Sequence, residues 1–113
     1  MIHCEINHIG NDDIIIVTGG THPHIGAVVV GTWEGEYAKV VSYGLPHHKE
    51  EDLFTELAKV WCNTFKKTVV ISGGIHIDNA TKEDITMLVD KTWENFYLLM
   101  ADNKLAIATL EQE

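Results

Sequence analysis

Hydrophobic and polar residues alternate over residues 2–8, a pattern that predicts a strand with one face in water. Two runs of branched apolar residues follow, within residues 13–18 and 25–33. Such side chains pack well on a pleated sheet, so both segments suit strands that are buried on both faces. A fourth strand is predicted over residues 37–43, after a Glu-Gly-Glu turn. We expect these four strands, joined in chain order, to form an antiparallel meander.

The next part of the chain changes to a helical period. Over residues 49–67 apolar residues recur at steps of three and four, with acidic residues near the start, where the helix dipole favours them. Residues 68–72 form a short branched run, which predicts a fifth strand.

A second helix is predicted to begin near Thr81, which with Asp84 three positions later resembles a capping box. We expect it to end near residues 102–103, and residues 105–110 to form a short final strand or an extended tail. The predicted buried stripe of this helix consists of Ile85, Leu88, Val89, Phe96, Leu99 and Met100.

The order β-β-β-β-α-β-α predicts an α+β fold, a two-layer sandwich of a mixed, mainly antiparallel sheet with both helices on one face. We expect residues 1–113 to form a single domain around one core. Because the central strands are apolar on both sides, the second face or an edge of the sheet would be buried in a homodimer or a larger assembly.

Charge and composition narrow the possible partners. The formal net charge is −9, from 17 acidic and 8 basic residues, and this argues against nucleic acids and anionic membranes as partners. No apolar stretch reaches the roughly 20 residues that a membrane helix needs, and the first residues lack a signal-peptide pattern, so we expect a cytoplasmic protein. Cys4 and Cys62 have no metal-site or redox-motif spacing and are expected to be reduced thiols.

Two segments of the chain share one pattern. Residues 15–22 and 69–76 both read as a branched strand, a hydroxyl residue, Gly-Gly, any residue and His. Chance, or a shared structural need for turns after both strands, is the alternative to a functional reason for this repeat. If the two strands are neighbours that end at the same edge of the sheet, the histidines that follow them would converge there with Asp78.

Three kinds of chemistry fit this cluster. His22, His24, His76 and Asp78 offer three imidazoles and a carboxylate, a set that suits zinc, iron or manganese. Hydroxyl residues beside the histidines suggest a nucleophile and its base, but no nucleophile-elbow motif is present and no acid is placed to orient a histidine. The Gly-Gly turns and the helix that starts after Asn79 offer backbone N–H groups to a phosphate or a cofactor.

The segments Gly19–Val28 and Gly74–Thr81 resemble the LpdD-like prenylated-flavin chaperones, a family of small accessory proteins of gallate decarboxylase. The likeness spans nearly the whole chain in length and in the order of its elements. It implies that the chain carries or protects reduced prenylated FMN, or FMN itself, for a UbiD-type decarboxylase, and that it does not itself decarboxylate a substrate. The alternative is a metal-dependent enzyme that uses the four cluster residues as ligands.

Under this resemblance the histidines would bond to phosphate oxygens or ring carbonyls, or hold a bridging divalent metal. The glycines would let the backbone approach the flavin, and Asp78 would orient an imidazole or ligate the metal. These motifs contain no arginine to offset a phosphate. The implied binding residues are Gly19, Gly20, Thr21, His22, His24, Ile25, Gly26, Gly74, His76, Asp78 and Asn79.

Overall fold

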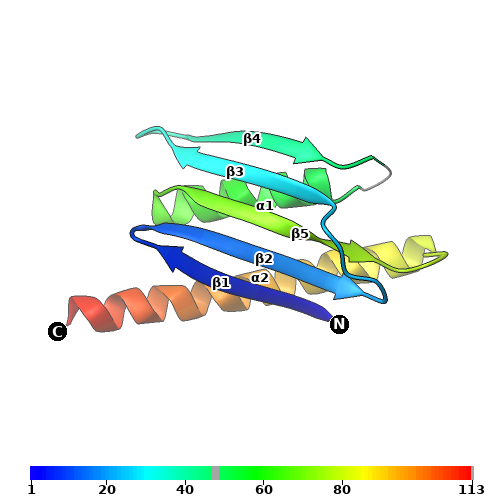
Figure 1. The fold of residues 1–113 in the computed structure, drawn as a ribbon. Helices are drawn as coiled ribbons and strands as arrows, with labels where there is room; N and C mark the ends of the chain where they lie inside the picture. The colour runs from blue at the N-terminus through cyan, green and yellow to red at the C-terminus, as the bar shows by residue number, and fades with distance from the viewer. Residues whose placement is uncertain (47–48, 113) are drawn as a thin grey trace.

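A computed structural model of the protein describes residues 1–46 and 49–112. The described part has a five-stranded mixed sheet and two helices, which confirms the predicted α+β class (Figure 1). In chain order the elements are β1 (Ile2–Ile9), β2 (Asp12–Gly20), β3 (Ala27–Trp33), β4 (Ala38–Gly44), α1 (Glu50–Phe65), β5 (Val69–His76) and α2 (Lys82–Glu111).

The strand order is β1-β2-β5-β3-β4, so the predicted meander of the first four strands is wrong. β1 with β2 and β3 with β4 do form antiparallel pairs, but β5 lies between β2 and β3, parallel to the first and antiparallel to the second. The reason lies in the loop of residues 21–26. It is long enough to span the roughly 10 Å of two strand spacings, and therefore leaves room for β5.

Both helices lie behind the sheet in the view of Figure 1, as predicted. α1 packs across β3, β4 and β5, whereas α2 packs mainly on β1. The largest fully buried side chains between these layers are Trp61, Phe54 and Phe96. Trp61 is therefore a core residue, and its tilted ring contact with Phe96, at 5.6 Å between ring centroids, joins the two helices on this face of the sheet.

A buried carboxylate ties the first hairpin to this core. Asp13, only 1% exposed, accepts a hydrogen bond from Nε1 of Trp61 at 2.8 Å. Its Oδ2 atom also lies 3.1 Å from Nζ of Lys67, and its Oδ1 atom lies 2.7 Å from Nδ1 of His8. A charge without such partners would be costly to bury, so this network fixes how β1, β2 and α1 meet.

The second helix differs from its prediction at its C-terminal end. Thr81 and Asp84 form the expected capping box, with N-to-side-chain-oxygen distances of 2.9 and 3.1 Å. However, α2 continues through residues 105–110, where a strand or tail was expected, because Leu and Ala are strong helix formers and no Gly or Pro ends the helix. In the predicted stripe Leu88, Phe96 and Met100 are buried and Val89 and Leu99 are partly buried, but Ile85 is 52% exposed.

The other face of the sheet has no helix on it (Figure 1). Alternate residues of its strands point to this face, and among them Val41 is 62% and Tyr43 is 65% exposed. The predicted homodimer, which would cover this face, stays a prediction. Within residues 1–46 and 49–112, no helix is both long and apolar enough to cross a membrane.

Candidate functional site

The parallel pairing of β2 with β5 brings the two echoed segments together. Gly20 pairs with His76 at the end of this register. The N–H group of Thr21 donates to the carbonyl oxygen of His76 at 2.8 Å, and the N–H group of His22 donates to the same oxygen at 3.4 Å. The predicted convergence of the loops is therefore confirmed. We call the cluster of His22, His24, His76 and Asp78 the histidine rim.

The three imidazoles of the rim lie close to one another. The ring centroid of His76 is 5.3 Å from that of His24 and 6.3 Å from that of His22. The Nε2 atom of His76 is 2.9 Å from Oδ1 of Asp78, and the Nδ1 atom of His22 is 3.2 Å from Oδ2 of the same residue. Asp78 thus bridges the two loops. Its position agrees with the expectation that Asp78 orients an imidazole, whereas the statement that no acid is placed to orient a histidine is wrong.

These rim contacts are exposed to solvent. The side chains of His22 and Asp78 are 66% and 60% exposed, so each contact is worth no more than about 1 kcal/mol. The Nδ1 atom of His22 also lies 3.2 Å from Oγ1 of Thr21, and both of its contacts therefore use one ring nitrogen. The other nitrogen, Nε2, makes no such contact with residues 1–46 or 49–112 and is therefore open to a ligand.

The metal interpretation gains no support from this geometry. Across the described ranges 1–46 and 49–112, no three His, Cys, Asp or Glu side chains are grouped so that they could hold a metal ion. The four predicted ligands do converge. Both carboxylate oxygens of Asp78, however, are directed at imidazoles of the rim, as an orienting residue would direct them.

The echoed glycines have a packing cause. A Cβ atom on Gly20, whose φ is +84°, would overlap the carbonyl oxygen of His76, and one on Gly73, with φ +128°, would overlap that of Val17. A Cβ atom on Gly74 would overlap the carbonyl oxygen of His24. These glycines let the ends of β2 and β5 and the loop between them approach closely. Contact of their backbone with a ligand stays a prediction.

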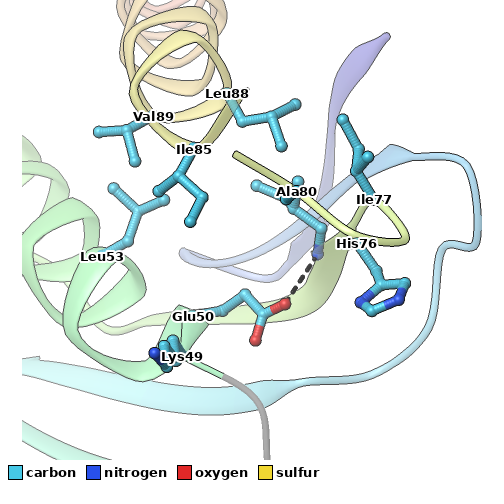
Figure 2. A pocket seen from close by; sticks show the side chains of 10 residues that line it. Lys49, Glu50, Leu53, His76, Ile77, Ala80, Ile85, Leu88 and Val89 are labelled. Carbon is cyan, nitrogen blue, oxygen red and sulfur yellow. Dashed lines mark hydrogen bonds between the residues drawn. The ribbon is translucent and has the colours of Figure 1, made fainter. Parts of the chain in front are cut away.

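A cavity of about 280 Å³ lies beside the rim, between the start of α1, the end of β5 and the start of α2 (Figure 2). His76 belongs to both the rim and the cavity wall. Sequence patterns missed this cavity because its lining comes from three separate elements. The residues not predicted to be functional are Lys49, Glu50, Leu53, Ile75, Ile77, Ala80, Ile85, Leu88 and Val89.

Glu50 is the acidic residue of the cavity lining and is only 8% exposed. Its Oε1 atom accepts a hydrogen bond from the backbone N–H of Ile75 at 3.1 Å, the dashed line in Figure 2. Its Oε2 atom has no hydrogen-bond partner in the described part of the chain and lies where a Cβ atom of Gly26 would be. The carboxylate therefore joins the start of α1 to the end of β5 and leaves no room for a side chain at residue 26.

Positive charge at the cavity comes from a residue that the motifs do not contain. The chain has no arginine, but Lys49 lines the cavity together with His76. The start of α2, by contrast, is capped by its own side chains, because Thr81 and Asp84 take up each other's backbone N–H groups. Lys49 is thus a better candidate than the α2 N-terminus for offsetting an anion.

The remaining predicted residues lie around these two features. Ile25 is 59% exposed on the loop that carries His22 and His24. Asn79 is exposed as well and takes a left-handed conformation, with φ of +56°, between Asp78 and the start of α2. Both are therefore open to a ligand that lies over the rim.

Two comparisons with known proteins bear on the family of this chain. Residues 1–103 match the family model for the prenylated flavin chaperone LpdD-like domain. The chain is also similar to Protein LpdD of Lactiplantibacillus plantarum (strain ATCC BAA-793 / NCIMB 8826 / WCFS1), with 35% identity over 86 residues. That alignment covers 74% of the chain and 63% of the relative, so it spans less than two thirds of the relative's length. The chain belongs to the LpdD-like prenylated flavin chaperone family.

Proposed function

We propose that this protein binds reduced prenylated FMN at the histidine rim, and carries or protects it for a partner UbiD-type decarboxylase. Membership of a chaperone family supports an accessory role without catalysis. The observation that carries the proposal is the parallel register of β2 and β5, which sets three imidazoles and a carboxylate at one exposed edge.

The rim residues fit a flavin phosphate or a ring carbonyl. His22, His24 and His76 would donate hydrogen bonds, and Lys49 would supply a fixed positive charge. Because His22 and His76 each turn one ring nitrogen toward Asp78, each would donate to the ligand from its other nitrogen as an imidazolium ion. Asp78 would hold His22 and His76 in the orientation that the ligand needs. The prenylated flavin would supply the decarboxylation chemistry only in the partner enzyme, so the task of this chain is to bind and release it.

Repulsion from acidic residues decides where the phosphate would lie. Two unit charges of like sign 4 Å apart repel by about 4 kcal/mol at an effective dielectric constant of about 20. Both oxygens of Asp78 are turned toward imidazoles, which reduces this cost at the rim. No such pairing is present at Oε2 of Glu50 among the described residues, so a phosphate would avoid the cavity and remain at the rim.

Anaerobic native mass spectrometry would test the proposal. Protein would be purified without oxygen from cells that make prenylated FMN, as wild type, as a His22→Ala, His76→Ala double variant, and as His8→Asn. His8 lies at the opposite end of the β1–β2 pair from the rim, and the asparagine amide of the control can still donate to Asp13, so the buried network keeps its donor. We expect the added mass of one cofactor on wild type and on His8→Asn, and its loss from the double variant.

Two outcomes would contradict the proposal. A wild-type protein that stays at its bare mass with excess cofactor does not bind it. A double variant that retains the cofactor as well as wild type does would move the site away from the rim.

A further inference from the structure

The walls of the cavity beside the rim are mostly apolar. Leu53 of α1 and Ile85, Leu88 and Val89 of α2 face one another across it, and Ile77 closes the side toward β5 (Figure 2). Its polar lining residues, Lys49, Glu50 and His76, come from the start of α1 and the end of β5. Such a cavity favours a ligand whose apolar group enters it while the polar part of the ligand remains outside.

The size of the cavity allows only part of a ligand to enter. At about 280 Å³ it is just below the range of roughly 300–1,000 Å³ that is typical for sites of whole drug-sized ligands. A whole flavin nucleotide exceeds this size. The cavity therefore suits one ring or a branched hydrocarbon group.

Ile85 marks the open side of the cavity. It belongs to the apolar stripe of α2, yet it is 52% exposed, whereas Leu88 one turn further is 7% exposed. Both residues line the cavity, so Ile85 is the lining residue of this pair that lies closer to solvent. A hydrocarbon group in the cavity would remove this side chain from water, which is favourable.

The charges at the cavity would fix which end of a ligand enters. The buried carboxylate of Glu50 disfavours an anion inside, whereas the exposed Lys49 and the half-buried His76 favour an anion at the solvent side of the cavity. A ligand that is apolar at one end and phosphorylated at the other would therefore bind with its apolar end inward.

We infer that the cavity receives the isoprenoid-derived hydrocarbon ring of prenylated FMN, and that it makes the protein prefer this cofactor to FMN. This inference rests on the proposed function. The two flavins share the phosphate and the ribityl chain, so the rim alone would not tell them apart. A matched apolar pocket discriminates even one methylene group by roughly 10–200-fold, and the added ring has several carbons.

The test compares the dissociation constants of reduced prenylated FMN and reduced FMN, measured anaerobically by titration calorimetry, with ligand-induced shifts in melting temperature as a second readout. Val89→Phe fills the cavity. Ile85→Asn removes the apolar mouth at an exposed position where the fold tolerates a polar residue. Met87→Phe is the matched control, since Met87 is on the same helix but does not line the cavity.

We expect wild type and Met87→Phe to bind prenylated FMN at least about 10-fold more tightly than FMN. Val89→Phe and Ile85→Asn should bring this ratio toward one, by weakening the prenylated ligand and leaving FMN within about twofold of its wild-type affinity. If FMN binds too weakly to measure, the test uses prenylated FMN alone, and each cavity variant should bind it at least about 10-fold more weakly than wild type does.

A wild-type ratio near one, or a ratio that neither cavity variant changes, would overturn the inference and leave the rim as the binding site. Failure of wild type to bind either flavin would overturn the proposed function itself. The two failures are therefore distinguishable in one set of titrations.

Discussion

Gly74 offers a direct test of how the rim is built, through the substitution Gly74→Ala. The residue is buried in β5 opposite Thr18, and its φ is outside the left-handed region, so alanine adds no backbone strain. Its Cβ atom would instead overlap the carbonyl oxygen of His24 and lie 3.0 Å from the nitrogen of Gly26. Both are backbone atoms, so the loop of residues 21–26 must move as a whole.

The movement is opposed by a short hydrogen bond, from the N–H of Gly26 to the carbonyl oxygen of Gly73 at 2.7 Å. Overpacking of a well-packed site costs typically about 1–3 kcal/mol. At about 4 °C per kcal/mol for a chain of this size, we expect the melting temperature of Gly74→Ala to fall by roughly 4–12 °C.

Gly31→Ala is the matched control. Gly31 lies in β3 of the same sheet, its φ is also outside the left-handed region, and its Cβ atom would have its nearest neighbours, an oxygen of Ala58 and a carbon of Val69, at 3.4 Å. This is close to ordinary contact. Because alanine also restricts the unfolded chain, a favourable effect of about 0.4–1 kcal/mol, we expect this variant to melt near or slightly above wild type.

Thermal unfolding followed by circular dichroism compares the two variants, and cofactor titration follows on each. Gly74→Ala should also weaken cofactor binding, because it shifts His24 away from His76, whose ring centroid is 5.3 Å distant in the wild type. Equal melting temperatures for the two variants would refute the packing argument. A lower melting temperature with unchanged affinity would retain the packing argument and exclude His24 from the site.

Three further predictions concern the rest of the molecule. Burial raises the pKa of the Cys4 thiol from 9.0 to about 11. Cys4 should therefore resist iodoacetamide at pH 8 until urea unfolds the chain. Its contribution to stability should be lost only as the pH rises from about 9 toward 11. Asp13→Ala should lower the free energy of unfolding, measured by urea titration, by about 3–5 kcal/mol, because it leaves Nζ of Lys67 and the indole of Trp61 without their acceptor. A loss below about 1 kcal/mol would contradict the role of this network. The double variant Val41→Lys, Tyr43→Lys should sediment as a monomer where wild type sediments as a dimer, because it places charges on the uncovered sheet face. A wild type that is monomeric at high concentration in sedimentation velocity would contradict the dimer prediction.

The dimer prediction depends on how charge is distributed over the chain. With a net charge of −9, two copies repel each other over most of their surface. The uncovered sheet face differs, because its central strands present branched apolar residues, and charged side chains such as Glu5 and Lys39 lie on its edge strands. A second copy can therefore approach there with little repulsion and cover apolar area from both sheets.

The period of the apolar pattern predicted which elements form, because that pattern is local. Strand pairing is not local. Nothing in residues 13–18 or 25–33 states that a segment from the second half of the chain will lie between them, and the expected meander left no place for it. The predicted burial of Ile85 is wrong for the same reason, since the apolar period of α2 does not say which of its residues other elements will cover.

The cavity was beyond sequence reasoning for a similar cause. Lys49 and Glu50 read as the ordinary charged start of a helix, and only the fold places them beside the end of β5. The rim was predictable only on a condition: two equal phrases that end parallel neighbouring strands meet at one edge, and the structure supplies the pairing of β2 with β5 that the sequence left open.

The structure separates two parts of that echoed phrase by cause. Gly20, Gly73 and Gly74 are required by packing, since any side chain there would strike a neighbouring carbonyl oxygen. The histidines that follow them have no such reason: the side chains of His22 and His76 are 66% and 41% exposed and do not pack in the core. The fold would form with other polar residues in these two places. The imidazoles of the rim are therefore the part of the repeat that function has to explain, and they are where loss of binding should occur without loss of stability.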